Sequence, residues 1–170
     1  MMTEVHIMEY SFRRAHNRDN KVVASIFNYF VENSFAAYSD TPVSPDFFNE
    51  QLESAYPFYV IETRDGEVIG FGSIRPYSHH ETLKRAATAM YFILPNYAGK
   101  GLGRRLLDVL TVEAKKIGVE TLLVHISSKN KPSLEFHKKS GFQKCGRFRR
   151  MGRKFGRDFD IVWMQKFIGN

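Results

Sequence analysis

The sequence predicts an α/β (α+β) fold with a mixed, mostly antiparallel sheet of seven strands, and two patterns carry most of this prediction. Two apolar runs rich in aromatic and β-branched residues, 58–63 and 68–74, flank the turn sequence Arg-Asp-Gly-Glu, which is typical of an antiparallel hairpin. An apolar run at 86–94, an amphipathic stretch that starts at Leu102 and an apolar run at 121–126 follow as strand, helix and strand. That order indicates a parallel crossover, so both kinds of strand pair share one sheet.

The N-terminal third of the chain is expected to supply one strand and two helices. Residues 6–12 form the first predicted strand. Asp19 or Asn20 is expected to cap a helix, because the apolar residues that follow recur at helical spacing. The Ser-Pro pair at 44–45 combines a capping residue with a first-turn proline, and it predicts a short helix that ends at Leu52.

Two further helices are expected in the C-terminal half. The helix that starts at Leu102 has one apolar face and is expected to end at Gly118, because glycine readily takes the left-handed conformation that closes a helix. Asn130 is expected to cap the last helix, which runs to Ser140.

The last two predicted strands, 143–148 and 160–167, form a hairpin around a basic loop at 151–157. The chain has 25 Lys and Arg against 18 Asp and Glu, a net charge of +7, and much of the positive charge falls between residues 138 and 157. Basic residues interspersed with phenylalanines could form a nucleic-acid surface or simply the solvated side of a strand and loop. No nucleic-acid motif accompanies them, so the second interpretation is favoured and nucleic acid is not the expected partner.

Composition places the chain among folded globular proteins. It has 170 residues, of which 43% are apolar and 25% charged, and we expect residues 1–170 to form one domain. No apolar run approaches the ~20 residues that a membrane helix needs, and the N-terminus lacks a secretory pattern, so we expect a cytoplasmic location without membrane contact. Cys145 is the lone cysteine, which excludes an internal disulfide, and we expect it to be a small packed residue.

A glycine-rich stretch at 95–104, Pro-Asn-Tyr-Ala-Gly-Lys-Gly-Leu-Gly-Arg, joins a predicted strand to a predicted helix. Uncovered N–H groups at the start of a helix form a site for an anion such as phosphate, although a tight turn that needs positive φ would also explain the glycines. A dinucleotide fingerprint requires glycine where Arg104 stands, and the stretch lacks the spacing of a Walker loop. What remains suits a pyrophosphate whose long arm runs back along the strand.

Other short sequences, spread over nearly the whole chain, accompany this loop. They are Val-Glu-Asn at 31–33, Pro-Val at 42–43, Gly-Glu-Val-Ile-Gly at 66–70, the stretch 130–142, and Gly-Arg-Lys-Phe-Gly-Arg at 152–157 followed by Asp160 and Met-Gln at 164–165. With these motifs the chain resembles the GNAT acetyltransferases, and within them the branch similar to phosphinothricin and methionine sulfoximine acetyltransferases. The resemblance implies a sheet with helices on both faces and acetylation of the amine of a small amino-acid analogue.

The resemblance also implies acetyl-CoA as cosubstrate, with no metal. The pyrophosphate is expected on the amides of the glycine loop, and the pantetheine arm beside the backbone of the preceding strand. Asn130, Ser133 and His137 share a helical face and match the family's donor-side helix. The other expected donor-binding residues are Phe92, Ile93, Leu94, Gly99, Lys100, Gly101, Leu102, Gly103 and Arg104.

Acetyl transfer needs a neutral amine, a polarised carbonyl and a proton for the departing thiolate. We expect the backbone N–H near Leu94 to polarise the carbonyl, and His137 to donate the proton or orient the ligand, unless it is only a packed histidine. Thr88 stands where the family usually has a glutamate base. We hypothesise that the amine proton passes through water to His79, His80 or bulk solvent, or that the acceptor amine has a low pKa.

Several residues are expected around the acceptor, although ordinary packing would explain any of the aromatic ones. They are Phe35, Tyr38, Tyr77, His79, His80 and Lys84. The predicted function is N-acetyl transfer from acetyl-CoA to the primary amine of a small molecule, an amino acid or analogue. The alternatives are a peptide or protein N-acetyltransferase and a non-catalytic acyl-CoA sensor. Related enzymes commonly form homodimers, and the same is expected here.

Overall fold

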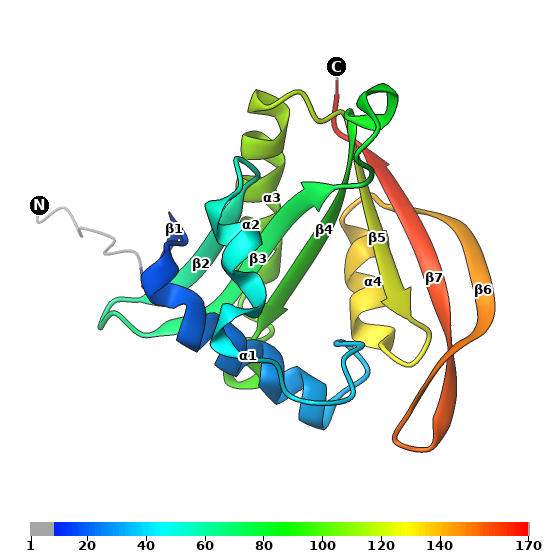
Figure 1. Ribbon diagram of the computed structural model, residues 1–170, viewed down its shortest axis with the longest axis horizontal. Helices are drawn as coiled ribbons and strands as arrows, with labels where there is room; N and C mark the ends of the chain where they lie inside the picture. The colour runs from blue at the N-terminus through cyan, green and yellow to red at the C-terminus, as the bar shows by residue number, and fades with distance from the viewer. Residues whose placement is uncertain (1–8, 170) are drawn as a thin grey trace, which may run out of the picture.

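The computed structural model describes residues 9–169 and contains one seven-stranded open sheet (Figure 1). The strand order is β1-β2-β3-β4-β5-β7-β6, and only β4 and β5 pair in parallel, so the mixed, mostly antiparallel prediction is confirmed. No helix within residues 9–169 is long and apolar enough to span a membrane. The strands are β1 (Tyr10–Arg14), β2 (Phe58–Thr63), β3 (Val68–Pro76), β4 (Ala86–Ile93), β5 (Thr121–Ser127), β6 (Gln143–Lys154) and β7 (Arg157–Phe167).

Helices cover both faces of the sheet, as expected (Figure 1). Leu106 and Leu110 of α3 pack with Ile74 of β3 in one apolar core, whereas Phe27 of α1 packs with Phe71 of β3 in the other. Alternate side chains of a strand point to opposite faces, so β3 contributes to both cores. The helices are α1 (Asn20–Asn33), α2 (Asn49–Glu53), α3 (Leu102–Lys116) and α4 (Lys131–Lys139), with short 3₁₀ turns at Asn17–Asp19, Pro45–Phe48, Glu81–Leu83 and Pro95–Tyr97.

The N-terminal elements differ from the prediction in two details. The first strand continues to Arg14, and residues 6–8 of the predicted strand lie outside the described part. Asp19 precedes α1 but its side chain makes no cap hydrogen bond to the helix. Its carboxylate instead accepts two hydrogen bonds from the Arg13 guanidinium, at 2.9 Å each, and these bonds hold the pKa of Asp19 below its usual range. The same carboxylate accepts a hydrogen bond from the His16 N–H at 2.9 Å, so it serves Arg13 and the 3₁₀ turn before α1.

The C-terminal hairpin is longer than predicted, because most of the basic segment 151–157 belongs to strands. The turn is Phe155 and Gly156, both in the left-handed region with φ of 50° and 69°. A shift of register between Phe148 and Gly152 lets β6 bend. Cys145 is exposed on β6, so the expectation of a packed residue was wrong: it lies on an edge strand most of whose residues are exposed.

The parallel pair β4 and β5 is short. Its register joins residues 86–88 to residues 121–123, whereas β4 continues to Ile93 and β5 to Ser127. Beyond Thr88 the two strands therefore diverge, and Figure 1 shows them opening toward the ends near α1 and α4. Along this opening β4 still pairs with β3 and β5 with β7, but the edges that face each other have no strand partner, and the site lies between them.

Candidate functional site

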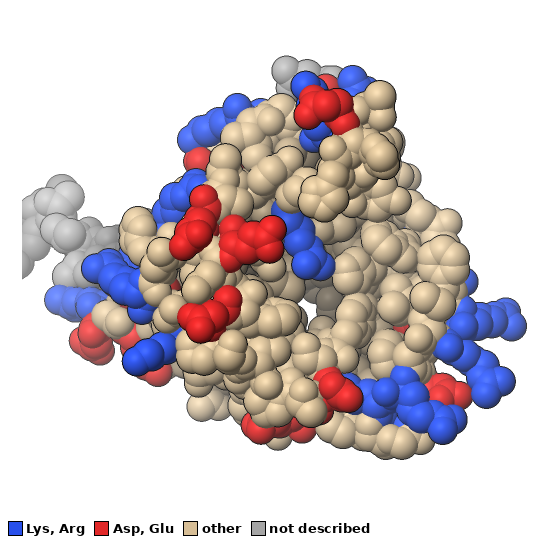
Figure 2. All heavy atoms as spheres, viewed as in Figure 1, with Lys and Arg blue, Asp and Glu red and all other residues tan. Residues whose placement is uncertain are grey.

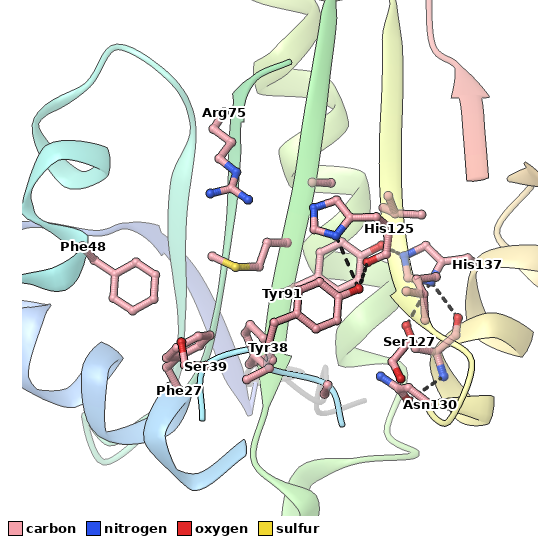
Figure 3. A pocket seen from close by; sticks show the side chains of 18 of the residues that line it. Phe27, Tyr38, Ser39, Phe48, Arg75, Tyr91, His125, Ser127, Asn130 and His137 are labelled. Carbon is pink, nitrogen blue, oxygen red and sulfur yellow. Dashed lines mark hydrogen bonds between the residues drawn. The ribbon is translucent and has the colours of Figure 1, made fainter. Parts of the chain in front are cut away.

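A cavity of about 190 Å³ occupies the opening between β4 and β5. Its walls come from α1 and the segment after it, from β3, β4 and β5, and from α4 with its cap, so residues far apart in the sequence meet here (Figure 3). Figure 2 shows a hollow in this face surrounded mainly by uncharged residues. Its polar or titratable lining residues are Tyr38, Ser39, Gln51, Arg75, Tyr91, His125, Ser127, Asn130, Ser133 and His137.

His137 of α4 is buried, with 3% of its surface exposed, and both ring nitrogens have partners. Nδ1 lies 2.6 Å from the carbonyl oxygen of Ser133, so Nδ1 carries the proton and donates it. Nε2 then accepts a hydrogen bond from the Tyr91 hydroxyl. Burial lowers the pKa of His137 to about 4, so the ring is neutral near pH 7. It orients Tyr91 and has no spare proton at Nε2 to give to a thiolate.

Tyr91 lines this wall of the cavity and was not among the residues that the sequence predicted. Its ring stacks on His137 with centroids 5.4 Å apart, and burial raises the pKa of its hydroxyl, so Tyr91 stays protonated. In the sequence it is one more aromatic residue in an apolar strand. Only its pairing with a histidine on α4, across the opening, distinguishes it.

The backbone N–H groups that face the opening are not the predicted one at Leu94. The N–H of Leu94 donates to the carbonyl of Ile69 on β3 at 3.0 Å, so it is not free to polarise a thioester carbonyl. Consecutive residues of a strand direct their N–H groups to opposite edges. The N–H groups of Tyr91 and Ile93 therefore point toward β5, into the opening where the ladder has ended.

The glycine loop has the backbone conformation expected of an anion site. Gly99 and Gly101 adopt φ of 76° and 74°, and Gly101 directly precedes α3. No side chain caps this helix, so the N–H groups of its first turn, from Leu102 to Arg104, face outward without a side-chain acceptor. The two charged side chains of the loop are engaged: Lys100 donates to the Tyr10 hydroxyl at 3.1 Å, and Arg104 pairs with Asp108 at 3.2 Å.

On the helix side of the opening, the Asn130 side chain accepts a hydrogen bond from the N–H of Ser133 at 3.3 Å and caps α4, as predicted. The Ser133 hydroxyl lies 3.2 Å from His137 Nδ1. Asn130, Ser133 and His137 all line the cavity, so the expected shared face is present.

The acceptor side of the cavity carries Arg75, which sequence reasoning also missed. Arg75 and Thr88 are register partners on β3 and β4, and Arg75 Nε donates to the Thr88 hydroxyl at 3.3 Å. Thr88 is 8% exposed and can accept this bond but cannot act as a base near neutral pH. No ion pair joins Arg75 to an acidic residue within 9–169, and its side chain is exposed at the cavity. The predicted strand stopped at Ile74, which put Arg75 in a loop.

Tyr38 and His125 also line the cavity. The Tyr38 hydroxyl, from the segment after α1, donates to the backbone carbonyl of His125 on β5 at 2.9 Å. The two rings also stack, with centroids 5.5 Å apart, and Figure 3 marks the hydrogen bond between the His125 ring and the Tyr38 hydroxyl with a dashed line. Tyr38 was predicted at the acceptor; His125 was not, because a single histidine in an apolar strand carries no signal of its own.

The remaining predicted acceptor residues do not line the cavity. Phe35 packs against Phe155 and Phe159 of the C-terminal hairpin and so supports the segment that carries Tyr38. Tyr77 is half exposed with its ring edge toward Trp163. The other three, His79, His80 and Lys84, are exposed in the segment between β3 and β4.

Known proteins resemble this chain along most of its length. Residues 23–142 match the family described as Acetyltransferase (GNAT) family. The L-amino acid N-acyltransferase MnaT of Escherichia coli K12 is 31% identical over 91% of this chain and 92% of its own. The solved structure of yncA from Salmonella typhimurium with its cofactor acetyl-CoA is 28% identical, covers 95% of both chains and superposes with a TM-score of 0.87. The crystal structure of ribosomal-protein-alanine N-acetyltransferase from Brucella melitensis is 32% identical in sequence. The match covers 92% of this chain and 99% of that chain, with a TM-score of 0.85.

Proposed function

This chain belongs to the acetyltransferase (GNAT) family and is an acetyl-CoA-dependent N-acetyltransferase of small molecules, and we propose that its acceptor is the α-amine of an amino acid or analogue whose carboxylate binds Arg75. The proposal rests on the Arg75 guanidinium in the cavity wall. Among the described residues it forms a hydrogen bond only with the Thr88 hydroxyl. A guanidinium presents paired donors that match a carboxylate. The small cavity suits a free amino acid.

We propose that acetyl-CoA lies along the opening between β4 and β5. Its pyrophosphate takes the outward N–H groups at the start of α3, and its pantetheine arm runs beside β4 toward the cavity. The thioester carbonyl then meets the N–H groups of Tyr91 and Ile93, which are directed into the opening. No group of three His, Cys, Asp or Glu side chains within residues 9–169 could hold a metal ion.

Transfer proceeds by attack of the neutral amine nitrogen on the thioester carbon. The carbon–nitrogen bond forms, the carbon–sulfur bond breaks, and the thiolate takes a proton released by the substituted nitrogen. Backbone donors stabilise the oxyanion. The Tyr91 hydroxyl donates its only proton to His137 Nε2, so the leaving sulfur receives its proton from the substituted nitrogen and not from Tyr91. His137 is a positioning residue in this scheme.

Mass spectrometry of an amine panel incubated with acetyl-CoA tests the proposal. The panel pairs each α-amino acid with its decarboxylated amine. We expect acetylation of amino acids and at least ~10-fold lower kcat/KM for the amines, since a charge-assisted hydrogen bond contributes about 1.5–3 kcal/mol. The variant Arg75→Gln should raise KM for the amino acid by a similar factor. Arg64→Gln, in the exposed β2–β3 turn, is the matched control. Equal use of both members of each pair would contradict the role of Arg75.

A second candidate is a peptide or protein N-terminal acetyltransferase, which the name of the Brucella melitensis structure favours. A peptide with N-terminal alanine distinguishes it from free alanine in the same assay. A non-catalytic acyl-CoA sensor would bind acetyl-CoA without acetylating any amine. The small volume of the cavity that Tyr38 and His125 line, about 190 Å³, supports the free amino acid.

We also propose that residues 1–170 act as one domain, in a cytoplasmic homodimer. The exposed thiol of Cys145 is consistent with a reducing compartment. The edge strand β6 is exposed over most of its length and displays Phe148 and Met151, which supports a second copy at this edge. Asp158 and Asp160 pair with three arginines of the hairpin, which leaves less positive charge for nucleic acid. Light scattering after size-exclusion chromatography measures the dimer.

A further inference from the structure

His125 lies at the part of β5 that has already separated from β4. Its ring is held between Tyr38, stacked at 5.5 Å, and Trp163 of β7, at 5.0 Å between centroids. It lines the same cavity as Arg75 and Tyr91 (Figure 3). A histidine fixed by two aromatic rings has one orientation, so its nitrogens face fixed partners.

The hydrogen bonds of Tyr38 set the tautomer of His125. The Tyr38 proton is donated to the backbone carbonyl of His125 at 2.9 Å. The Tyr38 oxygen therefore meets His125 Nδ1, 3.4 Å away, as an acceptor, and this long hydrogen bond requires the proton on Nδ1. Nε2 keeps its lone pair, and no described residue forms a hydrogen bond with it.

The other side chains of the cavity cannot take a proton from an amine. No Asp or Glu of the described chain lines it, and Thr88 is no base. His137 has both nitrogens engaged. His79 and His80 are exposed outside the cavity.

We infer that His125 Nε2 is the general base that accepts the proton of the acceptor's ammonium group, a role that rests on the proposed acetyl transfer. The ammonium nitrogen loses one proton to Nε2, and the neutral amine then attacks the thioester carbon. As the amide forms, the nitrogen releases its second proton to the thiolate, and the imidazolium returns its proton to solvent. The products are the acetylated amine, CoA thiol and one proton.

The charge on Arg75 links substrate binding to the strength of this base. Burial lowers the pKa of His125 below its usual range and the charge of Arg75 lowers it further, so the ring is neutral near pH 7. Two charged or titratable groups act on the His125 ring. Arg75 of β3 acts through its charge, and Tyr38 of the segment after α1 acts through a hydrogen bond. A substrate carboxylate bound to Arg75 neutralises its charge. The pKa of His125 then rises, so His125 is a stronger base once the acceptor is bound.

The pH dependence of kcat for His125→Gln tests this inference with the amino acid that the wild-type enzyme uses best. Near pH 7 we expect kcat to fall about 100-fold, because a general base contributes at least that much. The loss should shrink toward pH 10, where the amine is neutral without help. Added imidazole should restore part of the activity of His125→Ala. Acetyl-CoA affinity, measured by calorimetry, should not change.

Controls separate the base from its alternatives. His16→Gln, an exposed site near the start of α1, should match the wild type at every pH. A loss of equal size at all pH values, or the same pH-dependent loss in His79→Gln or His80→Gln, would overturn the role of His125. If His125→Gln does not fold, Tyr38→Phe takes its place, because it removes the hydrogen-bond partner of His125 Nδ1. An unchanged dependence of kcat on pH at the acidic end would then overturn the role of His125. No acetylated product from the wild-type enzyme with any amine would overturn the proposed function itself.

Discussion

Two histidines on opposite walls of one cavity differ in what their nitrogens can do. His137 donates from Nδ1 to a backbone carbonyl and accepts at Nε2 from Tyr91, so its ring serves as a rigid support. His125 donates from Nδ1 to Tyr38 and keeps Nε2 for a ligand. The same side chain is thus a positioning group in one place and a base in the other, because the partners decide which nitrogen is free.

His137 makes a testable contribution to stability against acid. Its folded-state pKa of about 4 lies below the unfolded value of 6.5, so the unfolded chain binds the proton first as the pH falls. Stability is therefore lost between pH 6.5 and pH 4, by about 3 kcal/mol when each pKa unit is worth 1.36 kcal/mol. His137→Gln should flatten this part of the curve of unfolding free energy against pH.

Urea denaturation at several pH values measures this effect. His125 also has a lowered pKa, so a smaller slope should remain in the variant. His16→Gln is the matched control and should keep the full slope. Parallel curves for the wild-type protein and His137→Gln would contradict the neutral state assigned to this ring.

At the scale of elements, the loop before α3 and the divergence of β4 from β5 form the donor site together. Left-handed glycines turn the chain from the end of β4 into the helix and leave the first-turn N–H groups uncapped. The short parallel ladder frees one edge of β4 beside this helix start. Each feature alone is common, and their adjacency provides both an anion site and a strand edge for the same long ligand.

Gly101→Ala should weaken acetyl-CoA binding at least ~10-fold, because an L side chain at φ of 74° costs about 1–2 kcal/mol and disturbs the amides that face the pyrophosphate. A Cβ there meets nothing within 4 Å, so strain and not a clash is tested. Gly66→Ala is closely matched, with φ of 86° and equally open space in the β2–β3 turn. It should lose similar thermal stability and keep full affinity by calorimetry. Equal affinities in both variants would argue against the anion site.

At the scale of the whole molecule, the acceptor wall is assembled from both ends of the chain. The Lys154 ammonium is buried and donates to the carbonyl of Ala37 at 2.7 Å, which ties the tip of the β6–β7 hairpin to the segment after α1. Phe159 of β7 stacks on Tyr38 at 5.8 Å. Tyr38 in turn holds His125, so the hairpin supports the proposed base through one intervening residue.

Lys154→Met should loosen this wall. The variant leaves a buried carbonyl without its donor, which costs about 1–3 kcal/mol of stability. We expect KM for the acceptor to rise several-fold while acetyl-CoA affinity stays the same, because the donor site lies on the other side of the opening. Lys144→Met, exposed on the same strand, is the control. A rise in the dissociation constant of acetyl-CoA as large as that in KM would show a global loss of structure instead.

Local patterns determined the elements of this protein and its donor. The hairpin β2–β3, the helix α3 with its closing glycine, and the Asn130 cap depend on residues adjacent in sequence, so periodicity and capping chemistry predicted them. The hairpin β6–β7 was underestimated, because a buried lysine that pairs with a distant carbonyl looks like any basic residue in a sequence. The motifs that indicate the family and acetyl-CoA also consist of residues adjacent in the sequence, so they could be recognised without the structure.

Only the tertiary structure decided the acceptor site. Arg75, Tyr91 and His125 come from three strands and carry no local signal, and their chemistry depends on which atoms face the cavity. The Leu94 amide was assigned to the oxyanion by position, yet its hydrogen bond to Ile69 shows that the register, which no single strand encodes, selects the free edge of β4. Long-range pairing sets tautomers, burial and pKa values, and sequence spacing cannot report them.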